Sequence, residues 1–126
     1  MYPEDLKYSK DHEWVLVDGD ECVFGITDFA QSELGEVVFV ELPEVGESFE
    51  SGDEMGTIES VKAVAEVYAP IGGEVIAVNE SLADEPEKVN NDPHTEGWLV
   101  RVKPSSPEEL GELMDASAYR ELLDNE

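Results

Sequence analysis

Short apolar runs separated by turn residues predict that most of this chain forms β-strands. Residues 13–17 and 21–26 are two such runs, rich in aromatic and β-branched side chains, and this composition is typical of strands. Asp18, Gly19 and Asp20 join them, and the Asp-Gly step supplies the positive φ that a tight turn needs. We therefore predict a β-hairpin at this position.

A short helix and a buried strand are predicted to follow this hairpin. Thr27 can cap the start of a helix that ends at about Leu34, where Gly35 would adopt the left-handed C-terminal conformation. Residues 37–42 then form a nearly continuous apolar run that Pro43 ends. A run of this kind favours a buried strand.

A second hairpin is predicted from residues 55–60 and 63–68, with Val61 and Lys62 as its turn. A two-residue turn fixes the register of the strands, and it pairs Ser60 with Ala63, Glu59 with Val64, and Ile58 with Ala65. Side chains on one face are then mostly apolar, and this predicted core face carries Gly56, Ile58, Ala63, Ala65 and Val67. The opposite face carries Thr57, Glu59, Val64, Glu66 and Tyr68. An ordinary type I turn accepts both Val and Lys.

The remaining chain is predicted to add two strands and two helices. We expect strands at residues 74–78 and 98–103, separated by a polar loop with a helical turn near residues 80–83. Residues 106–109 read Ser-Pro-Glu-Glu, a capping box with proline at the first helical position, which predicts a helix through about Met114. A second helix is expected from about Ala116, because Tyr119, Leu122 and Leu123 recur at helical spacing.

These elements predict a single mainly β domain with short helices. A chain of 126 residues fits one domain of modest core. We expect the domain to span residues 1–126, with a β core at about 6–103 and a helical appendage at about 107–124.

The charge of the chain excludes several classes of partner. Asp and Glu number 32 against 7 Lys and Arg, which gives a formal net charge of −25. Nucleic acid and anionic membrane surfaces are excluded as partners, because both need clustered cations. A dispersed acidic shell keeps a protein soluble at the cost of self-repulsion, and it is associated with high-salt cytosols. We therefore predict a halophilic source.

Cysteine, histidine and the termini indicate an intracellular protein without a metal. Cys22 is the only cysteine, so no intramolecular disulfide forms and nothing indicates secretion. His12 and His94 are far apart in sequence without neighbouring ligands, which favours ordinary loop histidines over a metal site. The start of the chain lacks the features of a signal peptide, and no apolar run reaches the length of a membrane helix. The cytoplasm is the predicted compartment.

Lys62 is the strongest candidate for chemistry. It is the only Lys or Arg between Lys10 and Lys88. A surface lysine without function is one interpretation, and a Schiff-base lysine is a second, but Glu59 and Glu66 would favour the charged amine over the neutral one. A third interpretation, a lysine that another enzyme acylates, suits an amine presented at a hairpin tip, and we rank it first.

The residues around Lys62 resemble a known attachment site. Glu59-Ser60-Val61-Lys62-Ala63 resembles the lipoylation site of the H-protein family of the glycine cleavage system. Further motifs of that family follow in the expected order along the chain, and they include His12-Glu13-Trp14-Val15, Gly25-Ile26-Thr27-Asp28, Leu34-Gly35-Glu36-Val37-Val38, Leu42-Pro43-Glu44-Val45-Gly46, Gly73-Glu74-Val75 and Leu113-Met114-Asp115. Lys88 and His94 depart from the residues that the family often carries.

The resemblance implies a fold and a function. The fold would be the flattened barrel-sandwich hybrid of lipoyl and biotinyl carriers, with lipoic acid joined to Lys62 by an amide. The recognition hairpin would consist of Glu59, Ser60, Val61 and Ala63. The protein would be a monomeric carrier rather than an enzyme, and it would bring the aminomethyl group from glycine decarboxylase (P protein) to the aminomethyltransferase (T protein). Dihydrolipoyl dehydrogenase (L protein) and a lipoyl-attaching enzyme would be the other partners.

The resemblance also implies a cleft that shelters the carried group. Glu13 and Glu66 match positions associated with that cleft, where a carboxylate can pair with a protonated amine. Val64 and Tyr68 would line the same cleft or a partner contact, unless neighbouring segments cover them.

Other carrier classes fit the residues less well. Biotin carriers favour Met on both sides of the lysine, and lipoyl domains of 2-oxoacid dehydrogenases usually have Asp before it. Val61 and Ala63 stand in those positions here. A module with an unmodified lysine, and a protein that mainly donates lipoyl groups to other complexes, stay open as alternatives.

The acidic shell leads to a test in salt. Because added cations screen repulsion between the carboxylates, raising KCl from low to molar concentration should raise the midpoint of thermal unfolding. Calorimetry across the KCl series measures this midpoint, and a midpoint that stays constant would contradict the halophilic interpretation.

Overall fold

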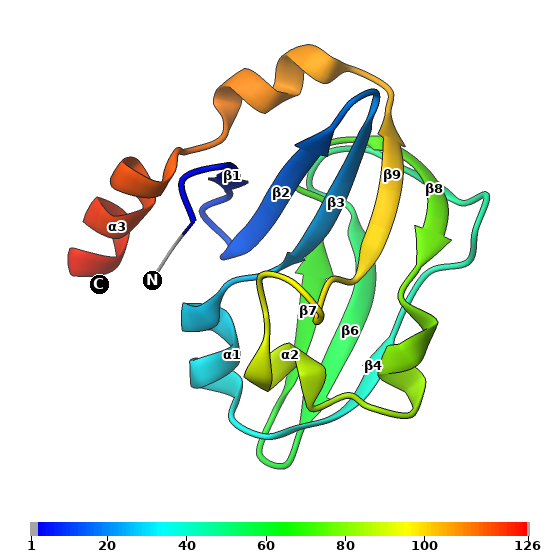
Figure 1. The fold of residues 1–126 in the computed structure, drawn as a ribbon, viewed down its shortest axis with the longest axis vertical. Helices are drawn as coiled ribbons and strands as arrows, with labels where there is room; N and C mark the ends of the chain where they lie inside the picture. The colour runs from blue at the N-terminus through cyan, green and yellow to red at the C-terminus, as the bar shows by residue number, and fades with distance from the viewer. Residues whose placement is uncertain (1–2, 126) are drawn as a thin grey trace.

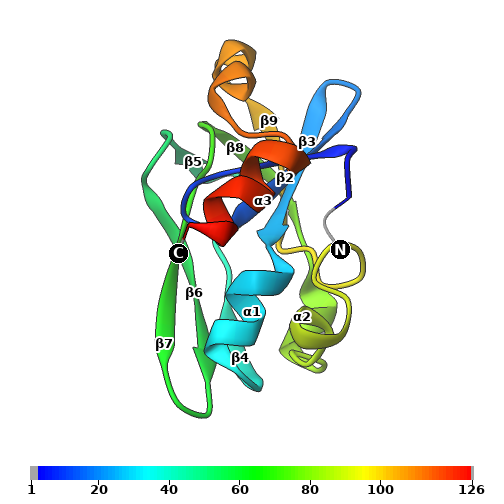
Figure 2. The same cartoon turned by 90° about the vertical axis from the view of Figure 1, so that its left-hand side faces the viewer.

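Two antiparallel β-sheets form the body of the protein in the computed structural model, which describes residues 3–125. The larger sheet contains, in spatial order, β1 (Leu6–Tyr8), β2 (Glu13–Asp18), β3 (Glu21–Ile26), β9 (Val100–Pro104), β8 (Gly73–Val78) and β5 (Ser48–Phe49). The smaller sheet contains β4 (Val37–Glu41), β6 (Glu54–Ser60) and β7 (Val64–Tyr68). Figures 1 and 2 show the β6–β7 hairpin reaching the far end of the molecule.

The main hydrophobic core lies between the two sheets. Val15 and Phe24 of the larger sheet and Ile58 and Val67 of the smaller one belong to the same buried cluster. The sheets face each other without closing into a barrel. The predicted fold class, a mainly β barrel-sandwich with short helices, is therefore confirmed.

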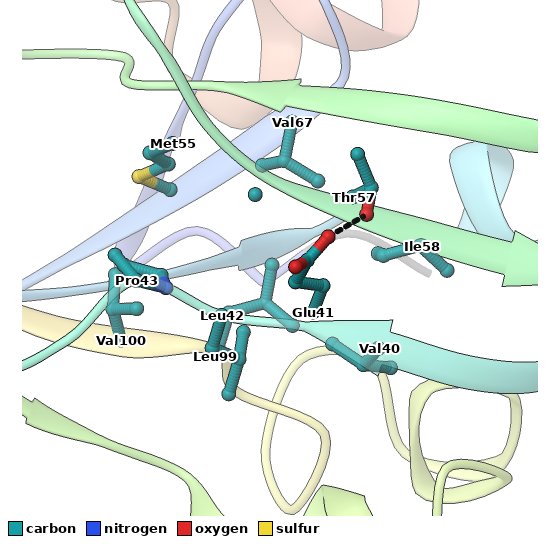
Figure 3. A pocket seen from close by; sticks show the side chains of 11 residues that line it. Val40, Glu41, Leu42, Pro43, Met55, Thr57, Ile58, Val67, Leu99 and Val100 are labelled. Atoms are coloured by element: carbon teal, nitrogen blue, oxygen red, sulfur yellow. Dashed lines mark hydrogen bonds between the residues drawn. The ribbon is translucent and has the colours of Figure 1, made fainter.

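Figure 3 shows side chains that line a small pocket between the two sheets. Val40, Ile58 and Leu99 help to line a cavity of about 10 Å³, at most the size of one water molecule. On strands of the same sheet, Thr57 Oγ1 donates to Glu41 Oε1 at 3.3 Å. This part of the core has no room for a cofactor.

The first helix begins where the sequence predicted it. Thr27 caps α1 (Asp28–Leu34), since its Oγ1 accepts a hydrogen bond from Ala30 N at 3.2 Å. Gly35 follows with φ 80° and ψ −154°. The positive φ was expected, but this ψ lies outside the left-handed helical region, so the predicted αL cap is wrong in that detail.

The strand over residues 37–42 is not buried as predicted. β4 is an edge strand of the smaller sheet, and an irregularity in its pairing falls between Val37 and Phe39. A bulge turns side chains that would otherwise alternate, so that Val38 and Phe39 are 44% and 54% exposed. The apolar composition of residues 37–42 therefore did not indicate burial of the whole strand.

The capping box predicted at residues 106–109 is also wrong. This segment forms the 3₁₀ helix η2 (Pro107–Glu112), and the Ser106 side chain caps nothing. Glu109 instead accepts a hydrogen bond from Gly72 N at 2.9 Å. The Glu109 carboxylate, which was expected to cap the N-terminus of a helix, therefore stabilises the turn before β8.

The connection between β8 and β9 contains more helix than predicted. The expected turn is present as η1 (Glu80–Ala83), and α2 (Lys88–Asn91), which was not predicted, follows it. β9 begins two residues later than the strand predicted from Trp98. Asp28 N donates to His94 Nε2 at 3.2 Å, which joins the loop after α2 to the start of α1.

The C-terminal helix packs against the body of the protein through a cluster that contains the fully buried Tyr119. α3 (Ala116–Asp124) occupies the position predicted for the second helix of the appendage. The Tyr119 ring stacks on Tyr8 with centroids 4.7 Å apart. Its hydroxyl lies 2.7 Å from both His12 Nδ1 and Thr27 Oγ1. His12 is thus part of a partly buried polar cluster with Thr27 and Tyr119 rather than an ordinary loop histidine.

No membrane-spanning element is apparent in the helices of residues 3–125, because none combines sufficient length with sufficient hydropathy.

The Tyr119 cluster gives a test of how the appendage is held. Tyr119→Phe should lower the free energy of unfolding by about 1–3 kcal/mol, because His12 and Thr27 lose a buried partner while the stacked ring stays. Urea denaturation measures the change, with Ser117→Ala on the exposed face of α3 as the control. A Tyr119→Phe protein as stable as this control would contradict the role of the hydroxyl.

Candidate functional site

The β6–β7 hairpin presents Lys62 at its tip. Ile58 pairs with Ala65 and Glu59 with Val64, and Ser60 N donates to Ala63 O at 2.8 Å. The register predicted from the sequence is confirmed. Lys62 is solvent-exposed in the turn between β6 and β7, and Figures 1 and 2 show this hairpin extending to one end of the molecule.

Ser60 closes the turn with its side chain. Its Oγ accepts hydrogen bonds from Ala63 N at 3.1 Å and from Lys62 N at 3.4 Å. The Ser60 hydroxyl also donates to Ala63 O at 3.2 Å. Neither Val61 nor Lys62 has a positive φ. This serine explains how the hairpin turns tightly without an Asn-Gly step.

The two faces of the hairpin differ in burial largely as predicted. Ile58 and Val67 on the inner face are 0% and 4% exposed. Ala63, predicted for the same core face, is exposed, because it lies at the tip beyond the cover of the larger sheet. On the outer face Val64 is 67% exposed, so no neighbouring segment among the described residues covers it.

The outer face carries an apolar and acidic row next to Lys62. Phe39 of β4 pairs with Glu59 of β6, which pairs with Val64 of β7. These side chains therefore lie side by side across the three strands. A partner that approaches Lys62 from this side meets two exposed apolar side chains with a carboxylate between them.

Gly35 and Glu36, which precede β4, contact the hairpin turn that carries Lys62. Val61 N donates to Glu36 O at 3.0 Å. Gly35 lies against the stem of Lys62, since a Cβ on this glycine would be 3.4 Å from Lys62 Cε. Lys62 takes part in none of the ion pairs found among residues 3–125. The Lys62 side chain is therefore supported by Gly35 although the residue is exposed to solvent.

Sequence analysis missed the residues that support the tip. Gly35 was interpreted only as a helix cap, and Glu36 provides a backbone carbonyl that no side-chain pattern reveals. Asn90 of α2 contacts both sides of Glu36, although it is far away in sequence. An apolar and polar pattern does not report such contacts.

Tyr68, at the end of β7 away from Lys62, contacts both Glu13 and Glu66. Ser9 Oγ donates to Glu13 at 2.6 Å, and Tyr68 N donates to Glu13 at 3.2 Å. The Tyr68 hydroxyl donates a hydrogen bond to Glu66 Oε1 at 3.3 Å. Tyr68 is six residues from Lys62, or about 20 Å at the rise of a strand.

The two carboxyl groups lie in different environments. Glu13 is 3% exposed, and burial raises its pKa from 4.5 to about 7 against the opposing effect of its hydrogen bonds to Ser9 and Tyr68. Glu66 is exposed, and its negative charge raises the pKa values of Tyr68 and Glu54. Glu13 can therefore gain or lose a proton near neutral pH, inside the protein.

A surface cleft of about 440 Å³ opens beside Glu13. Its wall includes residues from the β1–β2 turn, the loop after β7 and the chain before α3, namely Tyr8, Ser9, Glu13, Pro70, Leu113 and Met114. Of the four candidate cleft residues, Glu13 lines this cleft, whereas Glu66, Val64 and Tyr68 lie outside its wall.

The two facing sheets define a domain with the barrel-sandwich fold of lipoyl domains. The family model described as "Glycine cleavage H-protein" matches residues 6–126. The chain therefore belongs to the glycine cleavage H-protein family.

Individual relatives cover nearly the whole chain. The chain is 53% identical over 124 residues to the glycine cleavage system H protein of Halalkalibacterium halodurans, which covers 98% of this chain and 97% of the relative. It is 56% identical over 125 residues to that of Nitratidesulfovibrio vulgaris, with 98% and 96% covered. The crystal structure of a glycine cleavage system H protein from Mycobacterium marinum superimposes with a TM-score of 0.85 at 41% identity, covering 93% of this chain and 94% of that one.

The raised pKa of Glu13 predicts a pH-dependent stability. The folded state binds the proton more tightly than the unfolded state, so this group stabilises the fold fully below pH 4.5 and loses that effect as pH rises to about 7. The loss amounts to about 3 kcal/mol. Relative to Glu13→Gln, which cannot titrate, wild-type protein should lose about that much unfolding free energy between pH 4.5 and pH 8.

Urea denaturation at the two pH values measures the difference, and Glu66→Gln on the exposed face of β7 serves as the control. A stability gap between wild type and Glu13→Gln that is the same at both pH values would contradict the raised pKa.

Proposed function

We propose that this protein carries lipoic acid on Lys62 and shuttles the aminomethyl group of glycine between enzymes of the glycine cleavage system. The observation that supports it most is the exposed amine of Lys62 at a hairpin tip in a member of the H-protein family. An enzyme that acylates this amine has open access to it.

The residues at the tip fit an amide-linked arm. Acylation of Lys62 Nζ removes its charge, and no partner carboxylate among residues 3–125 is left unpaired by that loss. The recognition hairpin consists of Glu59, Ser60, Val61 and Ala63, in which Ser60 fixes the turn and Glu59 is exposed beside it. Lipoic acid, when bound, supplies the sulfur atoms that hold the one-carbon amine and accept or release electrons.

In this function the protein is a substrate of other enzymes rather than a catalyst. Its partners are glycine decarboxylase, the aminomethyltransferase, dihydrolipoyl dehydrogenase and a lipoyl-attaching enzyme, and we place all of them in the cytoplasm. A flexible arm on a monomer raises the effective concentration of the carried group at whichever enzyme is docked. The rigid sandwich provides a constant docking shape.

The carboxyl groups near β7 provide a resting place for the carried amine. Glu13 lines the 440 Å³ cleft, and Glu66 adds an exposed carboxylate on the neighbouring strand β7. A protonated amine would be attracted to these carboxylates. Tyr68 connects the two carboxylates, and Val64 lies between them and the tip as an apolar contact.

A conservative substitution tests the attachment site. Lys62→Arg keeps the positive charge and the long stem but cannot form the amide, so it should abolish lipoyl incorporation and the exchange of bicarbonate with glycine in the presence of the partner enzymes. Mass spectrometry and isotope exchange measure these outcomes.

Lys88→Arg is the matched control, because Lys88 lies on α2 in an ion pair with Glu85 at 3.2 Å. The control should be lipoylated and active. Exchange that persists in Lys62→Arg would show that the carried group is attached elsewhere.

A further inference from the structure

The tip of the hairpin contacts the body through a short segment that is neither helix nor strand. Residues 35 and 36 connect α1 to β4, and Glu36 O accepts the hydrogen bond from Val61 N at 3.0 Å. The Lys62 stem rests on Gly35 in the same segment. The position of Lys62 therefore depends on how firmly this segment is held.

Asn90 holds the segment on both sides of Glu36. Its Nδ2 donates to Gly35 O at 2.8 Å, and its Oδ1 accepts from Val37 N at 2.8 Å. Because one partner is a carbonyl and the other an N–H, only one orientation of the amide satisfies both bonds. The side chain thus binds the segment as the peptide group of a neighbouring strand would.

Asn90 is itself fixed from two directions. The preceding residue, Val89, is fully buried in the main core, which anchors α2. Asn90 Nδ2 also donates to Gln31 Oε1 at 2.9 Å, and Gln31 Nε2 in turn donates to Asp28 at 2.8 Å. The amide is therefore connected to α1 as well as to the segment that α1 precedes.

We propose that Asn90 is a positioning residue for the modification of Lys62, acting through Glu36 and Val61. The proposal rests on the proposed function, in that it assigns to Asn90 a part in presenting the lysine to the enzyme that lipoylates it. No sequence motif or similarity assigns a role to Asn90. The hydrogen bonds of its side chain go to Gln31, Gly35 and Val37 rather than to the lysine or the turn, so its effect passes through the Gly35–Val37 backbone.

The physical reason is a shift in the population of tip conformations. Without the Asn90 amide, Gly35 O and Val37 N lose their partner, and Gly35 no longer has support for its φ of 80° and ψ of −154°. The hydrogen bond from Val61 N to Glu36 O is then broken in part of the molecules. If the attaching enzyme binds only molecules with an ordered tip, its apparent affinity for the protein falls in proportion to the fraction of molecules in which the tip is ordered.

The experiment measures lipoylation kinetics of the full-length apo protein with a purified lipoate ligase, ATP and lipoic acid. Asn90→Ala should raise the KM for the protein substrate about tenfold and leave kcat within about twofold. Asn91→Ala, at an exposed position of the same helix, is the matched control and should behave as wild type. A loss in kcat alone, or unchanged kinetics, overturns the proposal.

Amide hydrogen exchange separates positioning from a general loss of structure. In Asn90→Ala, exchange at Val61 N–H should speed up at least tenfold, while Ile58 and Val67 in the same hairpin keep their protection. Equal acceleration at all three amides would mean that the helix only stabilises the fold, and it overturns the proposal.

Two further measurements keep the outcomes distinct. Asn90→Asp keeps the size of the side chain but cannot donate to Gly35 O, so it should reproduce the tenfold rise in KM if Asn90→Ala fails to fold. In wild-type protein, the Val61 amide should be protected, and free exchange there overturns the proposal without any variant. If wild-type protein is not lipoylated at all, the proposed function fails, whereas the Val61 exchange data still test the role of Asn90.

Discussion

The antiparallel pairing of β6 with β7 is the constraint on which the rest of the structure depends. The same strands supply one wall of the core, through Ile58 and Val67, and the projecting turn that carries Lys62. A slip of one residue would exchange the inner and outer faces. It would bury Glu59 and Glu66 against the larger sheet and expose the core. Burial therefore enforces the register, and the register fixes which residue stands at the tip.

The packed core and the candidate site of modification lie in different parts of the protein. The pocket that Val40, Ile58 and Leu99 help to line between the sheets has a volume of only about 10 Å³, which is too small for a cofactor. Support of the tip comes from backbone hydrogen bonds and from the side chains of Ser60 and Asn90, whereas Lys62 takes part in none of the ion pairs found among the described residues. The opposite end of β7 holds the only carboxyl group within residues 3–125 whose pKa is raised to about 7, that of Glu13. A fixed scaffold with a free amine is the arrangement that a swinging arm requires.

Local patterns were sufficient for the hairpin, and long-range contacts explain where they failed. The register around Lys62 and the Thr27 cap follow from residues close in sequence, and both were predicted. Phe39 was expected to be buried, yet edge position and a bulge expose it. Glu109 was assigned to a helix cap, but Gly72 N, 37 residues away, uses its carboxylate. Asn90 was missed for the same reason, since its partners lie more than 50 residues earlier.

The central claim is that Lys62 carries lipoic acid in the working protein. The most direct measurement is the intact mass of the protein purified from its own host, followed by peptide fragmentation that locates any added mass. The account predicts a mass increment of one lipoyl group on the peptide that contains Lys62. An unmodified Lys62 in protein from cells that are metabolising glycine, or a biotinyl increment at that residue, would contradict it.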